Sequence, residues 1–213
     1  MQIRDQKINF DGYSIYGGID VHDKSWKVTI MVGDTYYKTL SMDPKAGNLQ
    51  KYLEREFPGG TYYTAYEAGF CGFSIHRKLE EKGINNIVVN PADISTTDKD
   101  RSQKEDIRDS HKIARFLKNR DLTAIYVPER EMEELRSLVR FQKSVPKDLA
   151  REKNMIKSFL TIYGIVEPEE ISKIRNWSSK YIKRLEKIKM ETEYGKLVID
   201  EQLGILKFLR EKK

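Results

Sequence analysis

The chain has 213 residues, 34% of them charged and 38% hydrophobic, and 39 basic against 33 acidic residues give it a net charge of +6. This length excludes a mini-protein and suits one medium domain with an extension, while the mild basic excess permits nucleic acid as a partner without requiring it. The single cysteine, Cys71, excludes an internal disulfide, the three histidines lack zinc-site spacing, and neither a signal peptide nor a membrane-spanning run is recognisable, so we expect a cytoplasmic protein.

A polar leader over residues 1–12 precedes three expected strands, at 14–22, 25–33 and 34–42. Because the connections between them are short, neighbouring strands should run antiparallel. The first strand carries Asp20, and an acid within a strand loses hydration that a metal ion, a donor network or a bound proton must replace. The alternative interpretation is that Asp20 ends the strand and caps the turn beside Asp23.

The next segment alternates helices with strands. A helix should begin after Asp43-Pro44, and a fourth strand over 61–66 should end on Glu67, a second acid at the carboxyl end of a strand. A helix over about 70–82 and a fifth strand over 84–89 complete a strand-helix-strand unit, whose strands should be parallel. This order of elements matches the ribonuclease H-like layout, in which the first and fourth strands are neighbours.

After a polar loop over 92–103, a helix is expected over 104–117, and a helical wheel places Asp106 and Asp109 together on its apolar face. One acid in the first turn of a helix is ordinary because the helix dipole favours it, but two adjacent acids on the inward face indicate a functional pair. The opposite face and the preceding loop are basic, and these side chains either contact nucleic-acid phosphates or form an ordinary solvated face. The basic residues are Lys99, Arg101, Lys104, Arg108, Lys112 and Arg115.

A short extended segment over 122–127 should close this first domain, which we place at 13–128. Beyond it, apolar residues repeat at helical spacing, with a kink expected at Pro146 and a helix end at Gly164. Residues 129–213 should therefore form an all-helical, partly coiled-coil arm. We expect this arm to self-associate as a dimer or tetramer.

Four acids should converge on one edge of a ribonuclease H-like sheet: Asp20, Glu67, Asp106 and Asp109. Four carboxylates in one place repel one another unless cations bind, so the arrangement predicts one or two Mg²⁺ ions, with Mn²⁺ as a substitute. Two such ions can activate an attacking oxygen and stabilise the leaving oxygen of a phosphodiester. The residues therefore predict an α/β domain that cleaves or transfers DNA strands.

The chain also carries six short motifs: Gly18-Ile-Asp20-Val-His, Tyr66-Glu67-Ala-Gly, Val89-Asn-Pro, Lys104-Glu-Asp106-Ile-Arg-Asp109-Ser, Leu135-Arg-Ser-Leu-Val-Arg140 and Glu152-Lys-Asn154. Together they resemble the DEDD transposases, insertion-sequence enzymes related to the Piv DNA invertase. The resemblance implies a RuvC-like catalytic domain whose tetrad, Asp20, Glu67, Asp106 and Asp109, binds magnesium. It also implies a transposase or recombinase that cleaves and exchanges DNA strands under the guidance of a structured bridge RNA.

The same family has a C-terminal domain with a nucleophilic serine and a Pro-Gly-Ile-Gly type motif. No such motif follows Gly195, so we expect this serine domain to be absent from the chain, which bears on whether the chain recombines DNA by itself. Two alternatives stay open: a non-catalytic nucleic-acid-binding or assembly module, and a RuvC-like nuclease that uses water as its nucleophile. A sugar-kinase or actin-like ATPase fits poorly, because Val21-His22-Asp23 lacks the glycine and hydroxyl residues that approach ATP phosphates.

Overall fold

The computed structural model describes residues 8–94, 106–165 and 177–213. The chain divides into two compact units, Met1–Val127 and Pro128–Lys213, and each has a hydrophobic core of its own. The first unit contains β1 (Ser14–Val21), β2 (Trp26–Val32), β3 (Thr35–Met42), α1 (Ala46–Glu56), β4 (Thr61–Glu67), α2 (Ser74–Glu80), β5 (Asn85–Val89) and α4 (Asp106–Asn119). The second contains α5 (Arg130–Ile162), α7 (Ser179–Glu186) and α8 (Glu193–Glu211).

The five strands form one mixed sheet in the order β3-β2-β1-β4-β5. β2 pairs antiparallel with both β1 and β3, whereas β4 pairs parallel with both β1 and β5. This topology confirms the expected three-stranded meander, the parallel pair that follows it, and the contact between the first and fourth strands. A mixed sheet of this order with helices packed on it is consistent with a ribonuclease H-like fold.

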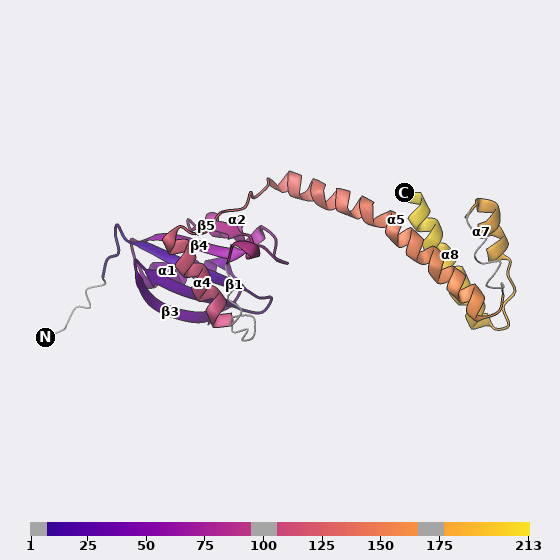
Figure 1. Ribbon diagram of the computed structural model, residues 1–213, viewed down its shortest axis with the longest axis horizontal. Coiled ribbons are helices and arrows are strands. Elements are labelled where there is room, and N and C mark those ends of the chain that lie inside the picture. Colours follow the sequence, from indigo (N-terminus) through magenta and orange to yellow (C-terminus); the bar gives the residue numbers. More distant parts are fainter. Residues whose placement is uncertain (1–7, 95–105, 166–176) are drawn as a thin grey trace. The chain divides into compact units, whose positions relative to one another are not determined.

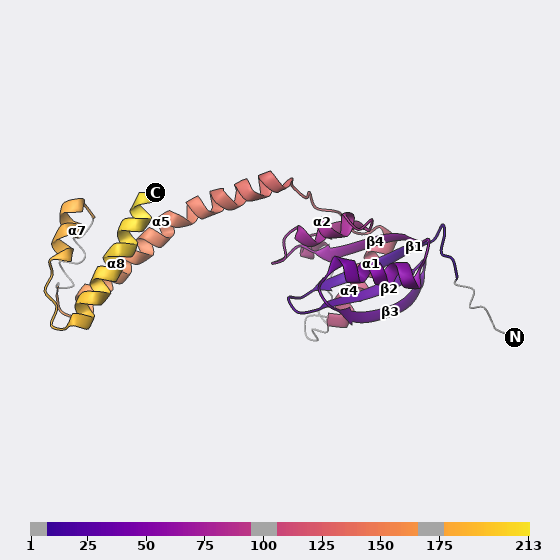
Figure 2. The ribbon, with the colours of Figure 1, turned by 180° about the vertical axis from the view of Figure 1, so that it is seen from behind.

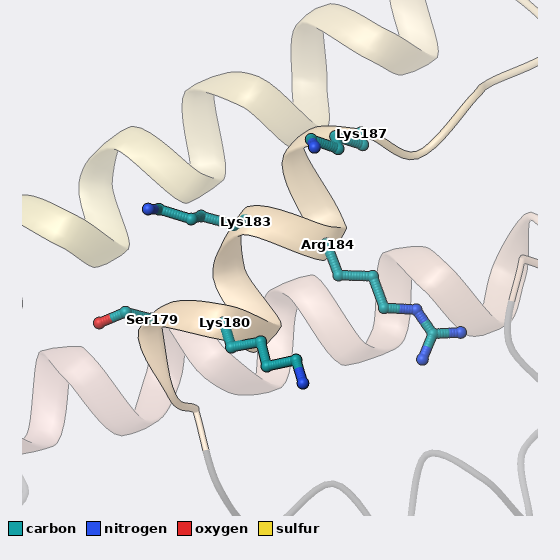
Figure 3. Close-up of a pocket in the computed structure, with 5 residues that line it drawn as sticks. All are labelled: Ser179, Lys180, Lys183, Arg184 and Lys187. Atoms are coloured by element: carbon teal, nitrogen blue, oxygen red, sulfur yellow. The ribbon is translucent and has the colours of Figure 1, made fainter.

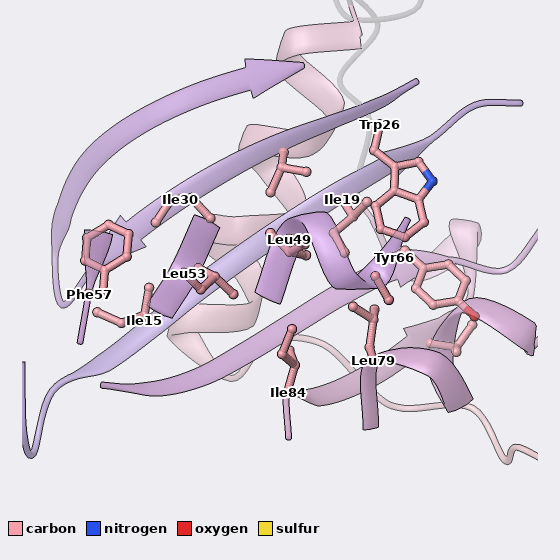
Figure 4. Packing of buried hydrophobic residues seen from close by; sticks show 13 residues of the cluster. Ile15, Ile19, Trp26, Ile30, Leu49, Leu53, Phe57, Tyr66, Leu79 and Ile84 are labelled. Atoms are coloured by element: carbon pink, nitrogen blue, oxygen red, sulfur yellow. The ribbon is translucent and has the colours of Figure 1, made fainter. Parts of the chain in front are cut away.

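Helices cover both faces of the sheet, because successive residues of each strand point to opposite sides. The face covered by α1 and α2 (Figure 2) holds the larger apolar cluster, which includes Ile19, Leu49 and Tyr66 (Figure 4). α4 covers the opposite face (Figure 1), and its Ile113 packs there with Ala65 of β4. The central strands are therefore buried on both sides, which fixes the positions of their carboxyl ends.

The backbone of α4 lies directly on β1 at Gly18. A Cβ atom at this position would overlap the carbonyl oxygen of Ser110 and the backbone nitrogen of Ala114, and it would lie 3.0 Å from the Ala114 Cα. Glycine is the residue that leaves room for this approach. A buried contact of 2.9 Å between the hydroxyl oxygens of Thr29 and Ser110 forms a hydrogen bond from β2 to the same turn of α4.

Two local structures differ from the expected ones. α2 begins at Ser74 rather than near residue 70, because Gly72 has a φ of +56°, a conformation outside the range of a right-handed helix. A short 3-10 helix at Pro91–Asp93 occupies the start of the segment expected to be irregular. The rest of that expected loop, from residue 95 onward, lies outside the described residues.

The segment after α4 returns to the outer edge of β5. Ala124 forms an antiparallel bridge with Val89, and the backbone N–H of Ile125 donates to the carbonyl oxygen of Val88 at 2.8 Å. These bonds confirm the extended segment expected over 122–127.

The second unit is helical, as expected. Pro146 lies inside α5, and Gly164, with a φ of +61°, follows the helix end at Ile162. The hydrophobic core of this second unit lies between the three helices. It consists of Leu149, Ile156, Leu160, Trp177, Ile182, Leu185, Ile199, Leu203 and Leu206. A coiled coil in this arm stays a prediction. None of the helices in the described ranges is both long enough and apolar enough to cross a membrane.

We predict that Gly18→Ala lowers the free energy of unfolding by about 3 kcal/mol, because the added methyl group forces α4 away from β1. Urea unfolding followed by circular dichroism measures the change. Gly47→Ala is the matched control, because nothing lies within 4 Å of a Cβ at Gly47 and alanine favours the helix by about 1 kcal/mol. Equal stability of Gly18→Ala and the wild type would contradict the close contact between helix and strand.

Candidate active site

Asp20 lies within β1, one residue from its end, and pairs across the sheet with Lys27 of β2. Asp20 is therefore part of the strand itself, and the turn that follows is closed by the backbone N–H of His22, which donates to the Ser25 carbonyl oxygen at 3.2 Å. Strand alternation places Asp20 on the same face as Gly18, which is the face that α4 covers. The side chain is 20% exposed.

Glu67 is the last residue of β4, directly beside Asp20. In the parallel pairing of β1 with β4, the last paired residues are Ile19 and Tyr66. Asp20 and Glu67 each follow directly, so the two acids lie side by side at the carboxyl ends of these strands. Glu67 is also paired with Val89, the last residue of β5. Three strand ends thus meet at one edge, and two of them carry an acid.

Asp109 reaches the same edge from α4. It precedes Ser110, whose hydroxyl contacts Thr29 and whose carbonyl oxygen lies over Gly18. Because Gly18 lies two residues before Asp20, the contact that holds α4 on the sheet also holds Asp109 near the first strand's acid. Asp109 is half-buried.

The electrostatics show that these three acids interact. The pKa of the Glu67 carboxyl is raised above its ordinary value, first by burial and then by the negative charges of Asp109 and Asp20. The positive charge of Lys112 lowers it in part. Three carboxylates from β1, β4 and α4 therefore share one region of the molecule, which we call the acidic edge.

One neighbour of the acidic edge was not expected from the sequence. The Nε2 atom of His22 lies 2.9 Å from the Oδ2 atom of Asp20. Alternate residues of an extended chain share a face, so the spacing of these two residues contained the signal. With Nε2 protonated, His22 donates a hydrogen bond to Asp20.

The predicted basic residues are only partly within the described chain. Lys112 is half-buried and close enough to Glu67 to lower its pKa, so it borders the acidic edge rather than the opposite side of the helix. Arg115 is exposed, with its guanidinium carbon 5.2 Å from the centre of the Phe116 ring. Three residues, Lys99, Arg101 and Lys104, lie outside the described residues, as does the side chain of Arg108.

The fourth acid, Asp106, begins α4, but its side chain also lies outside the described part. Within the part of the chain that the structure describes, no three His, Cys, Asp or Glu side chains form a group that could hold a metal ion as they stand. The chemistry of the donors nevertheless suits a hard cation, because carboxylate oxygens are the ligands that Mg²⁺ prefers. The repulsion that raises the pKa of Glu67 is also the kind that a bound dication relieves.

Comparison with known proteins identifies relatives of most of the first unit and of part of the arm. Residues 17–165 match the model of the IS110-type DEDD family, which is described as "Transposase". "Putative transposase y4qE" of Sinorhizobium fredii is 29% identical over 141 residues, which cover 66% of this chain and 35% of the relative. The "Transposase for insertion sequence element IS1533" of Leptospira borgpetersenii is 26% identical over 150 residues, which cover 68% and 43%.

A second Sinorhizobium fredii relative, "Putative transposase y4rJ", is 29% identical over 175 residues, which cover 74% of this chain and 44% of that protein. The chain thus spans less than half the length of each of these curated relatives. The family match includes the acidic edge and all of α5, and it covers more than half of the chain. The chain therefore belongs to the IS110-type DEDD transposase family.

Proposed function

We propose that this chain contains the catalytic unit of a DNA transposase that cleaves and exchanges strands during insertion-sequence transposition in a metal-dependent reaction. The observation that supports it most is the meeting of acids from three elements: the register of β1 and β4 places Asp20 beside Glu67, and the contact of α4 with Gly18 brings Asp109 to the same edge. Because the chain belongs to a transposase family, we expect the cleavage and joining of DNA phosphodiester bonds to take place at this acidic edge.

The residues that would hold magnesium, or manganese in its place, are Asp20, Glu67, Asp106 and Asp109. When bound, such ions supply Lewis-acid chemistry, which activates an attacking oxygen and stabilises a leaving oxygen. His22 would orient the Asp20 carboxylate by donating to its Oδ2 atom, 2.9 Å away. The ammonium group of Lys112 would offset part of the negative charge.

We also propose the partners of the reaction. DNA is the substrate, and the basic residues of α4 and the preceding loop, including Arg115, contact its phosphates or those of a structured guide RNA. The exposed apolar side chains in the first half of α5 support self-association into a dimer or tetramer. These side chains are Met132, Leu135, Leu138, Val139 and Phe141.

Two other functions fit the same family. A RuvC-like nuclease that uses water would share the metal requirement, and its cleaved DNA would carry no covalent protein link. A non-catalytic nucleic-acid-binding or assembly module would bind DNA without cleaving it in the presence of either metal ion. The three functions can be distinguished by incubating supercoiled DNA with the chain, with and without Mg²⁺, and then denaturing the protein. The assay shows whether the DNA is cleaved and whether protein stays covalently linked to it.

We predict saturable binding of Mg²⁺ and Mn²⁺ to the chain and its loss in Asp109→Asn, because the variant removes one charged ligand. Calorimetric titration in the absence and presence of duplex DNA measures both. Asp121→Asn is the matched control: Asp121 is exposed just beyond α4, so the same loss of charge there should leave metal binding unchanged. A wild-type chain that binds neither ion, even with DNA present, would refute the metal site.

We predict that Glu67→Gln raises the free energy of unfolding in metal-free buffer at neutral pH, because it removes a partly buried charge beside two others. The folded pKa of Glu67 lies above its ordinary value of 4.5, so the wild-type chain loses stability as the pH rises from 4.5 through the folded pKa. The difference between variant and wild type should therefore vanish at acidic pH, and urea unfolding at several pH values measures it.

Added Mg²⁺ should stabilise the wild-type chain and have less effect on Glu67→Gln. The control is Glu81→Gln, whose parent side chain is exposed, and magnesium should stabilise this variant as much as the wild type. A Glu67→Gln variant that is less stable than the wild type at neutral pH without metal would contradict the repulsion within the acidic edge.

We predict that the chain self-associates through the first half of α5 and that Leu135→Gln combined with Leu138→Gln weakens this association. The side chains are 49% and 52% exposed, so their replacement removes little packing within one chain. Light scattering at micromolar concentration measures the mass, with Ser137→Gln on the same exposed turn as the control. A monomeric wild-type chain would rule out this interface.

A further inference from the structure

The arm carries a compact basic surface that the acidic edge does not explain. It is formed by α7 and the residue after it, where Ser179, Lys180, Lys183, Arg184 and Lys187 line a hollow of about 560 Å³. All five side chains are exposed. Figure 3 shows them along the length of α7, with Lys180 and Arg184 extending to one side of the helix and Ser179 and Lys183 to the other. We call these residues the α7 basic surface.

The other side of α7 fixes this surface in place. Ile182 and Leu185 are buried in the core of the arm, together with Trp177 just before the helix. The first turn is closed by the Ser178 hydroxyl, which accepts a hydrogen bond from the backbone N–H of Tyr181 at 3.2 Å. The cations therefore project from a packed helix, so a partner does not have to order the segment before binding it.

The cations of the α7 basic surface are not neutralised within the described part of the arm. The acid of α7, Glu186, forms an ion pair with Lys207 of α8 and is therefore occupied elsewhere. None of Lys180, Lys183, Arg184 and Lys187 forms an ion pair with another described residue. Residues 180 and 187 are separated by about 10 Å along a helix axis, so four like charges repel one another within two turns.

We propose that the α7 basic surface binds the phosphate backbone of duplex DNA. Each strand of duplex DNA carries one negative charge per about 3.4 Å of the helix axis, so the length of this surface spans about three phosphates of one strand. The guanidinium of Arg184 matches a phosphate with two parallel hydrogen bonds, while the lysines act as point charges. The proposed contacts are to phosphates, which carry no sequence information, so binding should not depend on sequence.

The choice of duplex DNA rests on the proposed function, in which DNA is the substrate. A helix with exposed side chains also suits the wide major groove and accessible backbone of B-form DNA better than the deep, narrow major groove of an RNA duplex. The surface belongs to the second unit, whereas the acidic edge belongs to the first. The inference therefore adds a binding site to the arm and leaves the assignment of the acidic edge unchanged.

The test measures DNA binding by the full chain with fluorescence anisotropy, in buffer with a metal chelator so that no cleavage occurs. The variant combines Lys180→Gln, Lys183→Gln, Arg184→Gln and Lys187→Gln. We expect binding of a short duplex to weaken by about tenfold or more, and the magnitude of the slope of log affinity against log salt concentration to fall by about 3.6, since each of the four lost phosphate contacts lowers it by about 0.9. The double variant Lys180→Gln/Lys187→Gln should show about half of the change in slope.

The matched control removes the same number of charges from exposed positions in the first unit, through Lys38→Gln, Lys51→Gln, Lys78→Gln and Lys82→Gln. An equal loss of affinity in this control would overturn the inference, because net charge alone would then explain binding. Unchanged binding in the α7 variants, or tighter binding of an RNA duplex than of DNA, would also overturn it. Two unrelated DNA sequences should bind alike.

Failure of this inference can be told apart from failure of the proposed function. The α7 variants should keep the metal binding of the wild type, because the acidic edge is in the other unit. Metal binding without a contribution of α7 to DNA affinity would overturn only the inference. A chain that binds DNA through α7 but neither binds metal nor cleaves DNA would support the inference and overturn the proposed function.

Discussion

The approach of α4 to Gly18 is the contact on which the candidate active site depends. With no side chain at this position, the Ser110 carbonyl oxygen can lie against β1, and the Ser110 hydroxyl can reach Thr29 on the neighbouring strand. Both contacts are made by Ser110, the residue that follows Asp109. The position of α4, which carries Asp109, is thus set by its contact with β1, which carries Asp20. Because this contact is made by backbone atoms rather than by flexible side chains, α4 cannot shift easily on the sheet.

The acidic edge is a place where the folded chain accepts unfavourable electrostatics. Burial and two neighbouring carboxylates disfavour the charge of Glu67, and Lys112 offsets this effect only in part. A structure selected for stability alone would separate such charges or replace one of them by an apolar residue. Their presence in three different elements is explained if the proposed reaction, rather than the stability of the isolated chain, determines which residues occupy these positions.

The sequence predicted the sheet because hydrophobic alternation and short turns determine strand order locally. It also predicted the meeting of Asp20 and Glu67, since parallel neighbouring strands end at one edge. The role of Lys112 was not predicted, because a helical wheel divides residues between core and solvent and contains no information about Glu67, which comes from a distant strand. The late start of α2 depends on the backbone of Gly72, whose φ of +56° leaves no periodic signal. The position of the Asp106 side chain stays a prediction.

The segment that follows α4 has a consequence for the behaviour of the sheet in a crowded cell. An open sheet exposes backbone donors and acceptors along its outermost strands, and these can recruit strands of other chains into aggregates. The bonds from Ala124 and Ile125 occupy the outer side of β5. In the described sheet the other outermost strand is β3, whose side chains are mostly exposed. The fold thus limits unwanted strand addition at the end of β5, where Val88 and Val89 are already paired.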